Sequence, residues 1–335
     1  MGYIFDTLEK LVSVALPSGQ EHKQAELIAS LARPYCDEIY YDRAGNLVCR
    51  KKSFGKKLMI PAHMDVIGFM ATYADERGFI RFAPVGGHTA YSLINQRVRF
   101  QNGVYGYIRS DKTDEKKLSD ITKESLYIDI GASSRENALS MISIGDCAVF
   151  DAKPSKNGDF IITPYADNLA SCAVLLLAMS KTGTSVNDLY FVFTVQEELG
   201  LRGAKTAANA IMPDMGIAID LTRTGDAPSE LDKNKMSVRL GAGPAIKIRD
   251  SSLICDRPVV DFLRSCAENN GIAYQDEVLP AGGTDSAAMQ RSRHGVLSGC
   301  VSIPGRNIHS PSEIINEKDA EGAASLIACA AMTEI

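Results

Sequence analysis

The amino-acid sequence predicts an α/β protein that carries a small, mostly β insert. From residue 160 onward, apolar runs of strand length alternate with runs of helical spacing, which is typical of a layered domain around a largely parallel sheet. From about residue 70 to 160, helical periodicity fades and short alternating runs between turn residues take over. We therefore expect one domain built from residues 1–70 and 160–335, and an inserted β domain at residues 71–159.

The first 70 residues predict two helices and then three short strands. Apolar residues at helical spacing indicate a helix over residues 4–16, and Pro17 ends it. Ser18-Gly19-Gln20-Glu21 has the form of a capping box, which predicts a second helix that runs to about Ala32. Strand-like runs bounded by turn residues follow at 38–41, 47–50 and 57–61.

The insert is predicted from its turns. Asn102-Gly103 separates two apolar runs that begin at Val98 and Val104, which indicates a β-hairpin. Asn157-Gly158 is expected to join residues 148–150 to residues 160–162 in the same way. Residues 111–117 are predicted to form a charged loop.

The second half of the chain supplies the alternation of strands and helices. Strands are predicted at 189–195, 216–220 and 295–302, and helices at 168–180, 204–210, 258–269 and from 317 onward.

Composition excludes several classes of function. The chain has 335 residues, is 45% hydrophobic and 23% charged, and has a formal net charge of -5. It has no long run of Lys and Arg, which argues against a nucleic-acid partner.

The longest apolar stretch, Cys172 to Met179, is too short to span a bilayer, and residues 1–6 lack the pattern of a signal peptide. The eight cysteines form no C-x-x-C pair and are expected to be reduced thiols. We therefore expect a cytoplasmic protein that does not bind membranes.

Chemically active side chains lie near the ends of the predicted strands, where ligands gather in open α/β sheets. His63 ends an apolar strand and Asp65 follows two residues later. Residues two apart on a strand share a face, so the Asp65 carboxylate could accept the second ring N–H of His63 and fix the tautomer that a metal-ligating histidine needs. A core histidine satisfied by any neighbour is the plain alternative.

Glu197 and Glu198 follow directly after the buried strand at 189–195. Two adjacent carboxylates at such a strand end would repel each other unless a cation compensates them. One could bind a metal ion while the other takes a proton from water. A solvated surface pair is the alternative interpretation.

Three further candidates complete the pattern. Asp220 ends an apolar strand, His309 lies in a loop after a strand, and Asp167 stands at the start of a helix, where a plain N-cap is the alternative. Two histidines with several carboxylates suit a pair of divalent ions about 3.5–4 Å apart. The sequence contains no H-E-x-x-H pattern, so a single-zinc site of the thermolysin type is excluded.

Taken together, these motifs resemble the TET aminopeptidases, a family that includes proteins called glutamyl aminopeptidase, deblocking aminopeptidase or endoglucanase M. The resemblance runs nearly from end to end. It is carried by Leu16-Pro17-Ser18-Gly19 with Glu21, Ala62-His63-Met64-Asp65 with Ile67-Gly68-Phe69-Met70, Gly86-Gly87 before Gln96-Arg97-Val98, Tyr127-Ile128-Asp129-Ile130-Gly131-Ala132, Thr194 to Gly203, Gly282-Gly283-Thr284-Asp285, and Ile308-His309-Ser310-Pro311. The chain departs from the family pattern at Val66, Leu169, Ser171 and Asn307.

The resemblance implies a fold and a set of roles. It implies a layered α/β/α two-metal exopeptidase domain at residues 1–70 and 160–335, with an inserted small β-barrel-like dimerisation domain at 71–159. Two divalent ions per subunit, zinc or cobalt with manganese as a further choice, would be held by five ligands. The implied roles are His63 and Asp220 on one ion, Glu198 and His309 on the other, Asp167 bridging both, Glu197 as general base, and Asp65 as the partner of His63.

The implied function is that of an aminopeptidase that hydrolyses N-terminal residues from short peptides by means of a water activated between the two ions. Dimers would build a hollow tetrahedral dodecamer that admits only unfolded peptides. Two alternatives stay open, namely a two-metal hydrolase of another amide such as an N-acyl amino acid, and a non-enzymatic scaffold relative. A glycosidase is disfavoured because it needs two opposed carboxylates but no metal pair.

Overall fold

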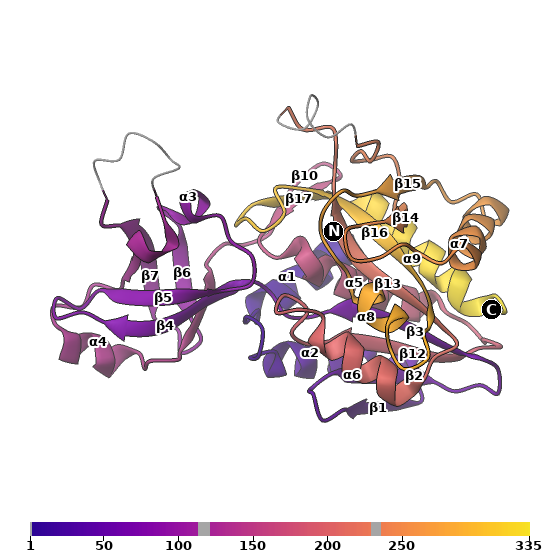
Figure 1. The fold of residues 1–335 in the computed structure, drawn as a ribbon, viewed down its shortest axis with the longest axis horizontal. Coiled ribbons are helices and arrows are strands. Elements are labelled where there is room, and N and C mark those ends of the chain that lie inside the picture. Colours follow the sequence, from indigo (N-terminus) through magenta and orange to yellow (C-terminus); the bar gives the residue numbers. More distant parts are fainter. Residues whose placement is uncertain (1, 113–120, 229–235) are drawn as a thin grey trace.

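The structure is a computed structural model that describes residues 2–112, 121–228 and 236–335. Its elements form a large sheet covered by helices and, at the left of Figure 1, a closed barrel. The α/β fold class predicted from the sequence, with its β insert, is confirmed.

The large sheet contains eleven strands among the described residues and follows the order β1-β2-β12-β3-β13-β16-β17-β11-β10, with β14 joined to β16 and β15 to β14. The neighbours β12, β3, β13 and β16 run parallel, whereas β1, β2, β17, β11 and β10 are joined to the sheet by antiparallel pairs. On the branch, β14 pairs antiparallel with β16 and parallel with β15. The strands are β1 Glu38–Tyr41, β2 Leu47–Lys51, β3 Lys57–His63, β10 Ser155–Asn157, β11 Phe160–Thr163, β12 Asp188–Thr194, β13 Met215–Arg223, β14 Ala245–Arg249, β15 Gln275–Val278, β16 Leu297–Arg306 and β17 Glu313–Asn316.

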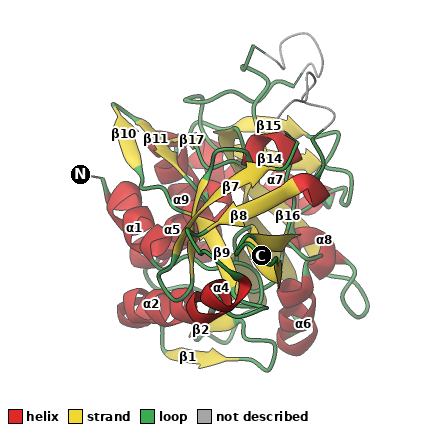
Figure 2. Cartoon of the chain, turned by 90° about the vertical axis from the view of Figure 1, so that its left-hand side faces the viewer, coloured by secondary structure: helices red, strands yellow, loops and turns green. Residues whose placement is uncertain are grey.

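Helices cover both faces of this sheet. Helices α1, α2, α5 and α9 contact one another on one face, while α6 and α8 contact each other and β3 on the opposite face, as the two sides of Figure 2 show. Strand β3 is buried between these layers: Leu58 and Ile60 belong to the main core, and Met59 packs on the other side with Ile211 of α6. The helices are α1 Tyr3–Ser13, α2 His22–Ala32, α5 Ala166–Lys181, α6 Arg202–Ile211, α7 Arg257–Asn269, α8 Asp285–Gln290 and α9 Glu317–Met332, with the short turn η1 Arg33–Tyr35.

The barrel is built by the segment from β4 to β9 and closes in the order β4-β5-β8-β7-β6-β9. Its strand β7 alternates strictly, with Gly106 and Ile108 buried and Tyr105 and Tyr107 exposed, as expected of a strand that has one face in a core and one outside. The barrel elements are β4 Gly68–Ala74, β5 Ile80–Val85, α3 Ala90–Leu93, β6 Arg97–Phe100, β7 Tyr105–Ser110, η3 Lys123–Ser125, β8 Leu126–Asp129, α4 Arg135–Met141 and β9 Cys147–Phe150.

Two local predictions were wrong, and one lies partly outside the described residues. Asn157-Gly158 joins β10 to β11, because residues 148–150 belong to β9 and pair with β4 and β6 in the barrel. The capping box does not form: the Ser18 hydroxyl donates to Asp65 instead, and α2 begins at His22 without a side-chain cap. The hairpin at Asn102-Gly103 is confirmed by the antiparallel pairing of β6 with β7. Of the charged loop at 111–117, residues 113–117 are not among those described.

The structure also contains elements that the sequence did not predict, among them β10, β14, β15, β17 and α8 outside the barrel and the helices α3 and α4 within it. Within the described ranges, no helix is both long and apolar enough to cross a membrane.

Candidate metal centre

The five predicted metal ligands meet at one edge of the large sheet. They come from five separate segments: His63 ends β3, Asp167 is in the first turn of α5, Glu198 follows β12, Asp220 lies in β13, and His309 follows β16. Parallel strands present their carboxyl ends at the same edge, which explains why residues distant in sequence converge there.

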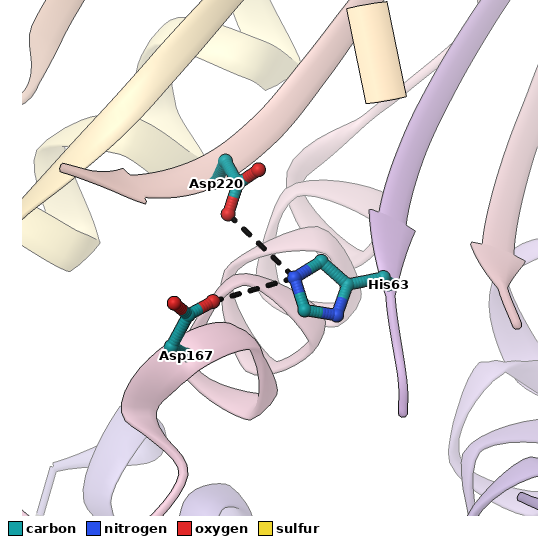
Figure 3. Close-up of side chains that lie close together, drawn as sticks. All are labelled: His63, Asp167 and Asp220. Atoms are coloured by element: carbon teal, nitrogen blue, oxygen red, sulfur yellow. Dashed lines mark ion pairs between the residues drawn. The ribbon is translucent and has the colours of Figure 1, made fainter. Parts of the chain in front are cut away.

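His63 and Asp220 form one half of the cluster. The Nε2 atom of His63 lies 3.3 Å from Oδ1 of Asp167 and 3.7 Å from Oδ1 of Asp220 (Figure 3). All three side chains offer a ligand atom within 4.8 Å of the other two.

Glu198 and His309 form the other half. The Nε2 atom of His309 lies 3.2 Å from Oε1 of Glu198 and 3.3 Å from Oδ2 of Asp167. The two oxygens of Asp167 therefore face different imidazoles, and Asp167 belongs to two of the three groups of possible ligand atoms found among the described residues. This is the arrangement that a carboxylate needs in order to bridge two ions. The third group contains His63, Glu197 and Glu198.

The spacing and chemistry of these side chains fit divalent ions. Two ligand atoms that are each about 2.1 Å from a tetrahedral zinc ion lie about 3.4 Å apart, and the separations in the cluster are 3.2–3.7 Å. Imidazole nitrogen and carboxylate oxygen are ligands for zinc and for related first-row metals.

The electrostatics of the cluster also point to a cation. Burial raises the pKa of Glu198, and it raises that of Asp220 to about 6. Burial alone would lower the pKa of His309, but its contacts with Asp167 and Glu198 raise it to about 11. Buried carboxylates in such numbers are costly without positive charge, and divalent ions would supply it.

Glu197 lies beside the cluster, farther from an imidazole than any of the predicted ligand carboxylates. Its Oε2 atom is 3.9 Å from Nε2 of His63, which is too far for a hydrogen bond, and its side chain is 12% exposed. Burial raises its pKa well above the ordinary value. Glu197 and the cluster line a pocket of about 340 Å³, whose far wall includes Thr222, Arg223 and Lys247.

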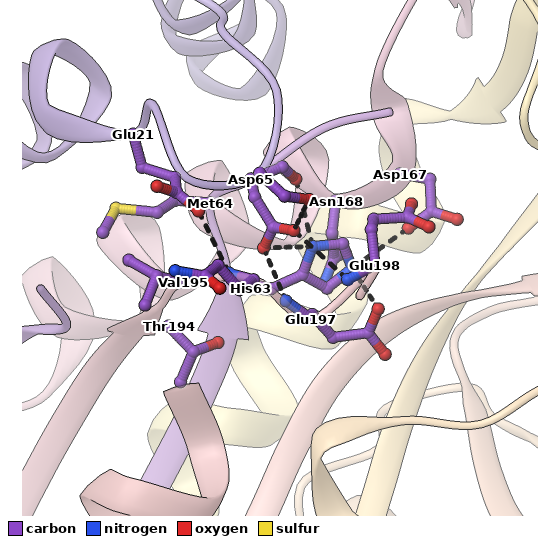
Figure 4. Close-up of polar contacts among 12 residues, drawn as sticks. Glu21, His63, Met64, Asp65, Asp167, Asn168, Thr194, Val195, Glu197 and Glu198 are labelled. Carbon is purple, nitrogen blue, oxygen red and sulfur yellow. Dashed lines mark hydrogen bonds and ion pairs between the residues drawn. The ribbon is translucent and has the colours of Figure 1, made fainter. Parts of the chain in front are cut away.

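Asp65 holds the turn that carries both glutamates. Its Oδ1 accepts the backbone N–H of Glu197 at 3.0 Å, and its Oδ2 accepts that of Glu198 at 3.2 Å and the Ser18 hydroxyl at 2.6 Å (Figure 4). The predicted carboxylate contact with His63 is longer, at 3.5 Å, and Nδ1 of His63 lies closer, 3.1 Å, to the backbone carbonyl of Asp65. Asp65 therefore supports the imidazole mainly through its backbone, and the glutamate turn through its side chain.

The plain alternatives for the separate motifs do not describe the geometry. Glu197 and Glu198 are not a solvated pair, since their side chains are 12% and 6% exposed. Asp167 is not the N-cap of α5, because that position belongs to Tyr165 and the Asp167 carboxylate faces the two imidazoles. His63 is buried, yet its Nε2 atom faces carboxylates and not core side chains.

Sequence reasoning assigned no role in the site to three buried carboxylates around the cluster, one of which, Glu21, it placed in a capping box. Glu21 accepts the backbone N–H of Gln196 at 3.0 Å, and Asp285 accepts the Thr194 hydroxyl at 2.5 Å. Glu313 accepts backbone N–H groups from two of the predicted ligands. Asp285 lies in a motif that carried the family resemblance, but nothing in the pattern around Glu313 distinguishes it from a surface glutamate.

Three of the four departures from the family pattern are buried. Val66 and Leu169 are fully buried, and Ser171 is buried in α5. Asn307, two residues before His309, is exposed and donates to the Ser312 carbonyl at 3.3 Å. None of the four replaces a residue of the cluster itself.

The chain is similar to known proteins along most of its length. Residues 45–326 match the M42 glutamyl aminopeptidase family. The chain is 45% identical over 325 residues to a candidate aminopeptidase of Acetivibrio thermocellus, covering 97% of both chains. Among solved structures it is similar to an aminopeptidase of the archaeon Desulfurococcus kamchatkensis, with a TM-score of 0.94, 37% identity, and 98% and 94% of the two chains covered. It is also similar to the TET1 peptidase of Pyrococcus horikoshii, which assembles into a tetrahedron or a large octahedral shell, with a TM-score of 0.87, 32% identity, and 98% and 99% covered.

The family match spans most of the sequence, and the fold agrees with solved members along nearly the whole chain. The chain therefore belongs to the M42 glutamyl aminopeptidase family.

Proposed function

We propose that this metal-dependent aminopeptidase removes the first residue from short peptides at a two-metal centre bridged by Asp167. The observation that carries the proposal is that the two carboxylate oxygens of Asp167 face different imidazoles, each at 3.3 Å. If the site held a single ion, the ligands in one half of the cluster would have no metal ion to bind.

The proposed ligands follow the two halves of the cluster. His63 and Asp220 would hold one ion, and Glu198 and His309 the other. Zinc or cobalt suits this set, and manganese is a third choice. When bound, divalent ions supply the electrophile that polarises the scissile carbonyl and acidifies the attacking water.

Glu197 is the proposed general base. Its carboxylate lines the pocket next to the cluster without contacting either imidazole at hydrogen-bond distance. It would take a proton from the attacking water at a carboxylate oxygen and deliver it to the nitrogen of the leaving amine. Asp65 holds the backbone N–H of Glu197, which limits the positions that the carboxylate can reach.

The relatives favour this activity over hydrolysis of N-acyl amino acids and over a non-enzymatic scaffold. A panel of aminoacyl-p-nitroanilides, each paired with its N-acetylated form, tests the proposal. We expect cleavage of free-amine substrates only. Cleavage confined to the acetylated forms, or no cleavage of any substrate by the metal-loaded protein, contradicts it.

We further propose that residues 1–70 and 160–335 form the catalytic domain and that the barrel at residues 71–159 is a dimerisation domain. The dimers would then assemble into a dodecamer. Support comes from the aromatic residues on the outside of β7, Tyr105 and Tyr107, and from the shells formed by the Pyrococcus horikoshii relative. We place the protein in the cytoplasm, because its eight cysteines are free thiols, as is usual in a reducing compartment.

A further inference from the structure

Glu313 stands where the two halves of the proposed metal centre meet. It is the first residue of β17, and its side chain is 1% exposed. In the sheet, β17 lies between β11, which leads to Asp167, and β16, which leads to His309. Glu313 is the register partner of Thr163 at the end of β11.

One carboxyl group thereby anchors two of the ligand residues. Its Oε1 atom accepts the backbone N–H of His309 at 2.7 Å, and its Oε2 atom accepts the backbone N–H of Asp167 at 2.8 Å. Both contacts are to the backbone, so they leave the imidazole of His309 and the carboxylate of Asp167 free to face each other.

The two anchored residues have unusual backbone conformations. His309 has a φ of 65°, in the left-handed region that a residue with a side chain seldom adopts. Asp167 has φ -80° and ψ 101°, which is not helical although it lies in the first turn of α5. The N–H groups in a first helical turn have no partner within the helix, and Glu313 supplies one for Asp167.

A purely structural role is the competing interpretation, and Asp319 provides the comparison for it. Asp319 is also 1% exposed, and its two oxygens accept the backbone N–H groups of Gly241 and Gly243 at 2.7 and 2.8 Å. Both carboxylates therefore have the same burial and the same hydrogen bonding. They differ in what they anchor, because only the donors of Glu313 carry proposed metal ligands.

We infer that Glu313 is a positioning residue for the metal centre, which holds the backbones of Asp167 and His309 so that their side chains face each other at 3.3 Å. The inference rests on the proposed function of the cluster as a metal site. The ion held by Glu198 and His309 should depend on Glu313 most. Removing partners that orient metal ligands typically weakens metal affinity or activity about 10- to 100-fold.

The test compares Glu313→Gln with Asp319→Asn. Each purified protein is stripped of metal and titrated with zinc in competition with a fluorescent chelator, and its thermal unfolding is recorded in parallel. In Glu313→Gln the amide group turns an N–H donor toward one of the two backbone N–H groups. We expect one of the two ions to bind at least about tenfold more weakly. Asp319→Asn should lower the Tm but keep the wild-type zinc affinities.

A second variant covers the case in which Glu313→Gln does not fold. Glu313→Asp keeps the charge but is one methylene shorter, so it cannot reach both N–H groups, and it should weaken the same ion. Wild-type zinc affinities in the Glu313 variants overturn the inference while leaving the proposed function intact, and so does an equal loss of affinity in Asp319→Asn. A wild-type protein that binds no zinc contradicts the proposed function itself.

Discussion

Among the acidic residues of the site, Glu197 is set apart by its distance from the imidazoles. The proposed ligands Asp167, Glu198 and Asp220 lie 3.2–3.7 Å from a histidine Nε2 atom, whereas Glu197 lies 3.9 Å from that of His63. If Glu197 does not bind an ion, its carboxylate would be free to exchange a proton with a reacting water, as the proposed general base must.

Replacing Glu197 by Gln should therefore separate metal binding from catalysis. We expect kcat to fall by about 10²- to 10⁴-fold, the usual contribution of a general base, while the metal content per chain stays that of the wild type. Glu198→Gln is the matched control, since it removes a proposed ligand from the neighbouring position and should lose metal together with activity. A fully active Glu197→Gln enzyme would refute the assignment.

The individual residues that could be predicted from the sequence are those whose side chains point into the site from the ends of strands. His63, Asp220 and Glu198 could be predicted because each follows an apolar run, and the ends of parallel strands converge. The roles of Glu21 and Glu313 could not be predicted, because both act by accepting backbone N–H groups. Glu21 accepts from Gln196 and Glu313 from Asp167, which are remote in sequence, and Glu313 also accepts from His309, four positions away. Only the folded chain brings those donors to them.

Among the elements, the segment that follows strand β5 of the barrel lies next to the proposed metal ligands. The segment that leaves β5 passes the cluster so closely that a Cβ atom on Gly87 would lie 2.9 Å from Nδ1 of His309. A Cβ atom on the preceding residue, Gly86, would lie 3.3 Å from Oε2 of Glu198. The insert therefore shapes the metal centre as well as the outer surface of the molecule.

Gly87→Ala should displace the His309 ring and reduce activity with little loss of stability. We expect kcat/KM to fall about 10- to 100-fold, the effect of misplacing a catalytic group by a fraction of an ångström to an ångström. Gly183→Ala is the control, because the nearest atom to its new methyl group would be the Met332 sulfur at 3.8 Å. Unchanged kinetics in Gly87→Ala would show that the segment yields without moving the ligand.

The loop after β13 is tied to the end of β16 by an ion pair that gives the fold a pH dependence. Arg306 donates to both oxygens of Asp226, at 3.0 and 2.7 Å. Burial raises the pKa of Asp226, but the hydrogen bonds and charge of Arg306 outweigh this and lower the pKa to about 2.

Since an unfolded aspartate has a pKa of about 3.9, the unfolded chain binds more protons than the folded chain between about pH 4 and pH 2. The stabilisation by Asp226 is therefore complete above about pH 4 and is lost as the pH falls toward 2. We expect Asp226→Asn to be less stable than the wild type at pH 6, and the difference to shrink by pH 3. Urea unfolding at several pH values measures this, and a constant difference would contradict it.

Strands β14 and β15 escaped prediction for a physical reason. Strands β12 and β13 read as long apolar runs, but β14 and β15 are short and carry Lys247 and Glu277, which are fully buried and paired with each other. In the amino-acid sequence, two strands that share a buried ion pair have the same polar pattern as segments exposed to solvent. The burial of each charge depends on a partner about thirty positions away, which no local pattern shows.

At the scale of the whole molecule, the layered architecture follows from periodicity, whereas closure of the barrel does not. The alternating runs predicted a β insert, but the ring closes by pairing its first strand with its last, as Phe69 does with Ala148. Pairing over such a sequence distance is set by the joint burial of residues such as Phe69 and Phe150, whose rings meet edge to face at 5.3 Å.

The outer face of the barrel gives the assembly proposal its test. We expect the wild type to form a large oligomer, and the double substitution of Tyr105 and Tyr107 by Glu to reduce its mass, because charge is depleted in the centre of protein interfaces. The matched control is the same change at Tyr40 and Tyr41, which are also exposed but lie on β1 of the large sheet. Light scattering after size exclusion measures the masses. A monomeric wild type would contradict assembly, and an unchanged mass in the barrel variant would contradict this interface.

The central claim is that one aminopeptidase site uses two ions bridged by Asp167. The most direct test is to add zinc or cobalt in measured equivalents to the metal-free protein while following hydrolysis of the best free-amine p-nitroanilide. We predict no activity before metal is added and a plateau at two ions per chain. Activity in the metal-free protein, or a plateau at one ion, would contradict the account.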